Sequence, residues 1–192
     1  HYDLPEPDPG HTFLAASDGP AGVGIMLEMA RLWQGEAFRP RRTVLFCAWA
    51  GGYHEISGAA TYLKDYTPYQ TLARDAVVHL GSVGAGDPTL LVSQTASFQT
   101  ASSQTASFQT GTMPALVNRS AQVVGVGTEA ASPNWHAYYK ELAPKAMAIG
   151  WQSAPDPYTG QDTPGNLRQE RLRQVGELVN LAFITASRQY YY

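Results

Sequence analysis

Acidic and histidine side chains are scattered along this chain, and several of them come directly after predicted strands. The candidates for metal ligation are His1, Asp3, Asp18, His54, Glu55, Asp87, His136, Asp156 and Asp162. A catalytic zinc ion needs about three protein ligands of this kind, an open coordination position and a general base nearby. The spacing by itself does not identify a set of metal ligands, because the chain has no HExxH, no CxxC pair and no P-loop.

Other chemistries have weaker support. A serine nucleophile elbow is absent, since no GxSxG occurs. The glycine-rich GSVGAG at 81–86 follows a strand, but no predicted helix opens behind it, which argues against phosphate binding. Cys47 is the single cysteine, so a disulfide framework is excluded, and we expect it to be a small buried hydrophobe. We expect His79 to be a core residue and His11 a loop residue.

Composition places the chain among globular proteins of one domain, residues 1–192. Charged residues make up 15%, and the formal net charge of -3 gives no basic footprint for nucleic acid. No run of about 18 apolar residues predicts a transmembrane segment. The sequence starts at His1 without an initiator Met, which we interpret as a processed or partial chain. We expect an extracellular or secreted protein.

The elements that must position these side chains alternate between strands and helices. Apolar runs predict strands at 43–50, 75–84, 89–93 and 146–153, and helical spacing predicts helices at 21–34, 56–66, 113–125 and 167–188. In the first helix we expect Val23, Met26, Leu27, Ala30 and Trp33 to share the apolar face. This alternation predicts an α/β fold, in which a mostly parallel sheet carries helices on both faces and sites form at the strand ends.

A repeat interrupts this pattern. The sequence SQTASFQT occurs at 93–100 and again at 103–110, within a stretch that has no charged side chain. Ser, Thr, Gln and Ala with one Phe per copy have poor means of making a core. We expect 93–110 to be a surface insertion; the alternative is an assembly element.

The order of segments resembles the zinc aminopeptidase and glutamate carboxypeptidase family, peptidase family M-28, which includes the non-enzymatic transferrin receptor ectodomain. The resemblance rests on SDGPAGVGIMLEMARL, FRPRRTVLFCAWAG, SGAATYL, VVHLGSVGAGD, APKAMAIGW and DPYTGQDTPGNL. It implies a three-layer, mainly parallel mixed sheet flanked by helices, of the zinc exopeptidase kind. Members usually carry further strands and a helix before the HYD segment, so we expect the N-terminal part of the fold to be lacking.

The resemblance also implies a site of two zinc ions, five ligands and a glutamate base. His1 matches a ligand, Asp3 matches the acid that orients it, and Asp18 matches the acid that bridges both metals. The adjacent glutamates, base and ligand, fall on Gly52 and Tyr53, and a ligand aspartate falls on Gly81. The final histidine ligand has no counterpart in DPYTGQD. A residual pair, His1 and Asp18, is therefore all that the resemblance leaves for metal.

Two hypotheses follow. In the first, the chain is a non-catalytic peptidase-like domain with a binding, structural or self-assembly role, without a cofactor and with a protein partner or a second copy to contact. In the second, it is an active zinc-dependent aminopeptidase or carboxypeptidase, whose metal site uses His54, Glu55 and Asp87 instead. Bound zinc would separate the two.

Overall fold

A computed structural model describes residues 2–4, 14–51, 58, 61–62, 77–94, 113–131 and 146–188 of the chain. Most of the helix predicted at 56–66 lies outside these ranges, although Gly58, Thr61 and Tyr62 have helical backbone. The repeat at 93–110 also lies outside them, apart from its first two residues.

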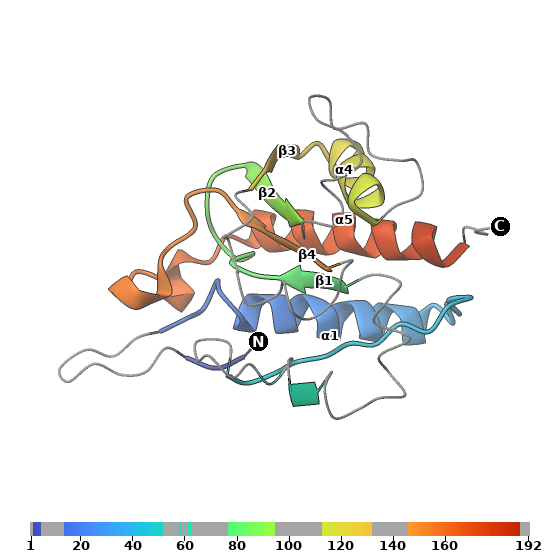
Figure 1. Cartoon of the computed structure of the whole chain (residues 1–192), viewed down its shortest axis with the longest axis horizontal. Coiled ribbons are helices and arrows are strands. Elements are labelled where there is room, and N and C mark those ends of the chain that lie inside the picture. Colours follow the sequence, from blue (N-terminus) through green and yellow to red (C-terminus); the bar gives the residue numbers. More distant parts are fainter. Residues whose placement is uncertain are drawn as a thin grey trace.

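A mixed sheet forms the centre of the fold (Figure 1). Its strands are β1 (Val77–Leu80), β2 (Thr89–Gln94), β3 (Gly127–Ala130) and β4 (Ala146–Trp151), in the spatial order β1-β4-β2-β3. β1 runs parallel to β4 and β2 parallel to β3, whereas β2 and β4 are antiparallel. The predictions for β1, β2 and β4 are confirmed in position. The sequence analysis missed β3, because GTEA carries no apolar alternation.

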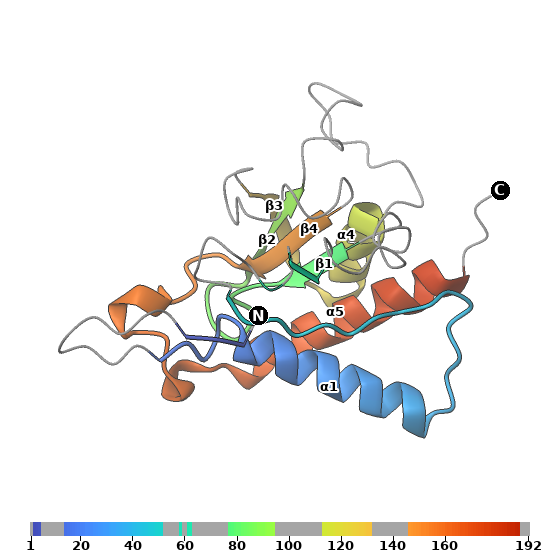
Figure 2. The ribbon, with the colours of Figure 1, turned by 60° about the horizontal axis from the view of Figure 1, so that its bottom comes forward.

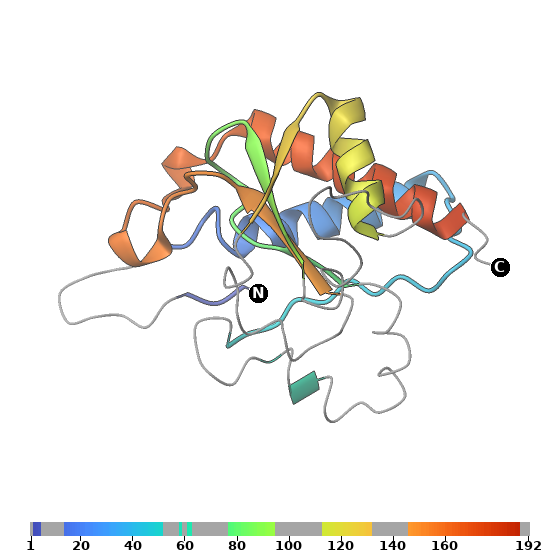
Figure 3. The same ribbon diagram turned by 45° about the horizontal axis from the view of Figure 1, so that its top comes forward.

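Three helices pack side by side as a layer on this sheet. They are α1 (Pro20–Gly35), α4 (Met113–Val124) and α5 (Gln169–Arg188), and α5 lies between the other two, in contact with both (Figures 2 and 3). Two short 3-10 helices, η3 (Pro157–Thr159) and η4 (Pro164–Asn166), lie in the loop between β4 and α5. The helices predicted at 21–34, 113–125 and 167–188 are thus confirmed to within two residues at each end. None of the described helices is both long and apolar enough to span a bilayer.

The core lies between the sheet and this helix layer. Ile149 and Trp151 of β4 are buried there against Val175, Leu178 and Ala182 of α5. Trp151 also satisfies its polar atom, because its indole Nε1 donates a hydrogen bond to the carbonyl of Val83 at 2.9 Å. His79 is 7% exposed, which confirms its prediction as a core residue. The core therefore fixes the end of β4, from which the last loop departs.

The predicted inner face of α1 is correct at Trp33 and wrong at Leu27, while the other three predicted residues are only partly buried. The structure buries Ala21, Ile25, Met29 and Trp33, which follow one another at intervals of four residues, and leaves Leu27 67% exposed. Apolar residues occur nearly all round this helix, so periodicity alone could not select a face. Gly22 decides it: a Cβ there would lie 2.9 Å from the Cβ of Leu80, so the glycine side of α1 is the one that approaches β1.

The predicted buried strand at 43–50 is also wrong. These residues have no strand pairing, and Leu45 and Phe46 are 47% and 39% exposed. The segment runs alongside α1 (Figure 1). The ring centroids of Phe46 and Trp33 lie 5.5 Å apart there. Apolar composition favours a strand, but a neighbouring ladder has to receive it, and no described strand does so. Cys47 is half-buried rather than buried, and this burial raises the pKa of its thiol.

Candidate functional site

Asp18 is the acid around which the candidate site is arranged. It is 6% exposed and lies in the turn just before α1, where Gly19 has a φ of 89° and Pro20 is the first helical residue. The left-handed backbone at Gly19 suits glycine, and proline suits the first turn of a helix, so the local sequence favours this turn. Asp18 also forms an isolated antiparallel bridge with Ser82, directly after β1.

A buried hydrogen-bond network holds this turn. Both carboxylate oxygens of Asp162 accept hydrogen bonds, from the backbone N–H of Ser17 at 2.6 Å and from that of Asp18 at 2.9 Å. The Ser17 hydroxyl accepts from the backbone N–H groups of Gly84 and Ala85, each at 2.9 Å. Three loops, which precede α1, follow β1 and follow β4, thereby meet around Asp18.

The loop after β4 brings Tyr158 to the same place. Asp156 caps η3 by accepting a hydrogen bond from the backbone N–H of Tyr158 at 2.9 Å. Burial, and then the negative charges of Asp18, Asp156 and Asp3, raise the pKa of the Tyr158 phenol. The phenol thus stands among carboxylates, although Tyr158 remains 55% exposed.

The structure therefore brings some of the predicted residues together. The charges of Asp3 and Asp18 both raise the pKa of Tyr158. Gly81 is buried next to the bridge between Asp18 and Ser82. The hydrogen bond from Tyr2 N–H to the Trp49 carbonyl, at 3.1 Å, ties the Asp3 segment to the end of the 43–50 run. The other predicted positions His1, His11, Gly52, Tyr53, His54, Glu55 and His136 lie outside the described residues.

Two of the remaining candidates, Asp87 and Asp162, are among the described residues. Asp87 is exposed, and its backbone N–H donates to the Gln152 carbonyl at 2.8 Å. Asp162 is 0% exposed and uses both carboxylate oxygens for backbone N–H groups. Burial raises the pKa of Asp162, while the hydrogen bonds from Asp18, Ser17 and Ala16 oppose this and the charge of Asp18 adds to it. Asp162 is a support of the site rather than a ligand in it.

Sequence reasoning missed the part played by Tyr158 and by Ser17. The only available signal for Tyr158 was its place in the DPYTGQD loop, where the family resemblance led us to look for histidine alone. Nothing in the sequence marked Ser17, since its partners Gly84 and Ala85 are more than sixty residues away.

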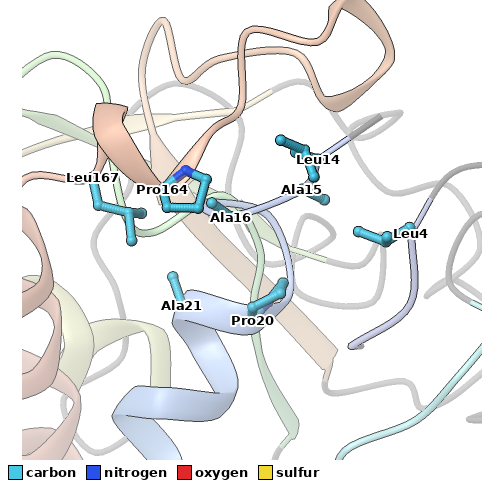
Figure 4. A pocket seen from close by; sticks show the side chains of 8 residues that line it. All are labelled: Leu4, Leu14, Ala15, Ala16, Pro20, Ala21, Pro164 and Leu167. Atoms are coloured by element: carbon cyan, nitrogen blue, oxygen red, sulfur yellow. The ribbon is translucent and has the colours of Figure 1, made fainter. Parts of the chain in front are cut away.

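An apolar pocket of about 310 Å³ opens beside this turn. Alanine, leucine and proline side chains line it, from the segments before α1, from the first turn of α1 and from η4 and its end (Figure 4): Leu4, Leu14, Ala15, Ala16, Pro20, Ala21, Pro164 and Leu167. The pocket holds no charged side chain, so it offers apolar contact and no chemistry of its own.

The described residues do not supply the donor set of the two-zinc centre that the resemblance implies. Among the described residues, no three His, Cys, Asp or Glu side chains are grouped so as to hold a metal ion. Zinc in proteins is bound by Cys, His and carboxylate ligands. Here the loop after β1 contributes Gly81, and the loop after β4 contributes a phenol with a raised pKa, which resists the deprotonation that metal binding needs.

Comparison with known proteins gives two positive findings. The family described as Peptidase family M28 matches residues 1–182. The crystal structure of Legionella pneumophila LapA aminopeptidase is similar in fold, with a TM-score of 0.67 and 18% sequence identity, over 92% of this chain and 47% of that one. The chain thus spans about half the length of that aminopeptidase. No curated protein matches the chain in sequence.

Proposed function

This chain belongs to peptidase family M28, and we propose that it is a non-catalytic member whose role is binding, structural support or self-assembly. The observation that carries the proposal is Gly81. It is buried beside the bridge between Asp18 and Ser82, where the family resemblance implies a carboxylate ligand opposite the bridging acid. Glycine has no side chain with which to bind a metal ion.

The remaining positions point the same way. By the family resemblance, the general base falls on Gly52 and its neighbouring ligand on Tyr53. Removal of a general base alone typically costs about 10²–10⁴-fold in rate. A two-metal mechanism also needs both ions in place to clamp the attacking and leaving oxygens. Loss of the base together with ligands for both ions leaves no route to the hydrolysis typical of this family.

A contact role fits the exposed apolar residues. Leu45 and Phe46 present large side chains to solvent next to α1, and the chain carries few charges that would oppose association. We propose a protein partner or a second copy of this chain as the occupant, and an extracellular setting. Neither the pocket nor the acidic residues select a particular partner.

Metal content tests the proposal most directly. The purified protein is offered Zn²⁺, dialysed and analysed for zinc, with an aminoacyl chromogenic substrate assayed in parallel, with and without a chelator. We expect zinc near zero and no chelator-sensitive hydrolysis. About two zinc ions per chain with chelator-sensitive hydrolysis would overturn the proposal and favour the active exopeptidase, in which His54, Glu55 and Asp87 replace the missing ligands.

A further inference from the structure

Two buried polar residues, Ser17 and Asp162, meet beneath Asp18. The Asp162 carboxylate accepts from two successive backbone N–H groups, those of Ser17 and Asp18, and its backbone carbonyl accepts from Ala16 N–H at 3.2 Å. Hydrogen bonds to an ionised carboxylate are stronger than those between neutral groups. One residue of the last loop thus fixes three consecutive residues of the turn before α1.

Ser17 holds the same turn from the opposite side. Its hydroxyl accepts from Gly84 and Ala85, and its carbonyl accepts from Val83 N–H at 3.1 Å. The approach is close, because a Cβ on Gly84 would lie 3.0 Å from the Cα of Ser17. These bonds join the loop after β1 to the turn that carries Asp18.

We propose that Asp162 is a positioning residue for Asp18: it clamps the Asp18 turn against the loop that carries Tyr158, and so sets where the Asp18 carboxylate stands in the site. The clamp depends on both carboxylate oxygens. An asparagine in this place has a single acceptor oxygen and leaves one of the two N–H groups without a partner.

The geometry of the clamp supports this role. Asp162 is fully buried, and both of its carboxylate oxygens accept hydrogen bonds from the backbone of the Asp18 turn. Burying a carboxylate close to a second acid costs folding free energy. Such a group is retained where its hydrogen bonds hold a particular geometry. The inference concerns the same site as the proposed function but holds whether or not that site binds metal.

Tyr158 reports on the clamp. Burial and the charges of Asp18, Asp156 and Asp3 raise the pKa of its phenol, so we expect a change in the placement of Asp18 to change that pKa. The experiment labels the tyrosine rings with ¹³C at Cζ, assigns Tyr158 by loss of its resonance in Tyr158→Phe, and follows its titration by NMR with a chelator present. The variants compared are Asp162→Asn, Asp18→Asn and, as a matched acid-to-amide control on exposed β3, Glu129→Gln.

We expect Asp18→Asn to lower the titration midpoint of Tyr158, Asp162→Asn to lower it in the same direction by a comparable amount, and Glu129→Gln to leave it unchanged. If Asp162→Asn is folded and the Tyr158 midpoint stays at the wild-type value while Asp18→Asn lowers it, Asp162 stabilises the fold without positioning Asp18, and the inference is overturned.

A second measurement needs no variant, in case Asp162→Asn does not fold. In wild-type protein, the amide resonances of Ser17 and Asp18 should titrate together with the Asp162 side-chain carboxyl carbon, at one shared midpoint. Independent midpoints would contradict the clamp. This measurement is also made with the chelator present. Bound zinc found in the metal analysis would therefore overturn the proposed function and leave this result standing.

Discussion

Asp18 and Ser82 form an isolated antiparallel bridge, which joins the turn before α1 to the residue that follows Gly81. This pairing places the buried Asp18 beside Gly81, the position at which the family resemblance implies a second acid.

A carboxylate introduced at Gly81 should supply part of a metal site. We expect Gly81→Asp to raise the affinity for Zn²⁺ about tenfold over wild type, which is about 1.4 kcal/mol, because it adds a carboxylate ligand near Asp18. Isothermal titration calorimetry measures this. Gly35→Asp is the control, because a Cβ at the end of α1 meets no atom within 4 Å there. An equal gain in both variants would show that added charge alone is responsible.

The contact between α1 and β1 predicts opposite effects of two alanines on one helix. Gly22→Ala should lower the free energy of unfolding by about 1–3 kcal/mol, since its Cβ would lie 2.9 Å from the Cβ of Leu80 and 3.0 Å from its carbonyl oxygen. Gly24→Ala should raise it by about 0.5–1 kcal/mol, because that Cβ meets nothing and alanine favours helix. Urea unfolding compares them, and two changes of the same sign would contradict the packing.

The inner face of α1 can be tested in the same assay. Ile25→Ala should lower the free energy of unfolding by about 2–5 kcal/mol, because Ile25 is buried in the core. Leu27→Ala should change it by no more than about 0.5 kcal/mol, because that side chain is mostly exposed. A larger loss for Leu27 than for Ile25 would restore the face that periodicity suggested.

The raised pKa of Asp162 predicts a pH dependence of stability. The folded protein holds this proton more tightly than the unfolded chain, so the contribution to stability is complete below the unfolded pKa and is lost as pH rises through the higher folded pKa. We expect the difference in free energy of unfolding between wild type and Asp162→Asn to decrease over that rise. Urea unfolding at several pH values from mildly acidic to neutral measures it, and a difference that increases with pH would contradict the sign.

The self-assembly arm of the proposed function predicts concentration dependence. If Leu45 and Phe46 bind a second copy, the double variant Leu45→Ser with Phe46→Ser should shift the protein toward monomer in sedimentation velocity, since it removes exposed apolar contact area. Leu27→Ser, at an exposed site on α1, is the matched control. If association is unchanged in the double variant, or is lost equally in the control, Leu45 and Phe46 do not form the interface.

The sequence by itself determined the family, the long helices and most of the strands, because local periodicity and ordered motifs carry that information. By the family resemblance, it also placed Gly52, Tyr53 and Gly81 where acids are expected. It did not select the buried face of α1 correctly, because apolar residues lie on several faces of that helix. It also predicted a strand at 43–50, where pairing depends on a neighbouring strand that periodicity does not reveal.

Only the tertiary structure decided how the site is built. Asp162 reaches Asp18 across 144 residues, and Ser17 reaches Gly84 across 67. Tyr158 joins them because its loop is folded back by Asp162 and capped by Asp156. Such contacts depend on where the ends of strands and helices come to lie in space, and side chains that are far apart in the chain leave no periodic signal in its sequence.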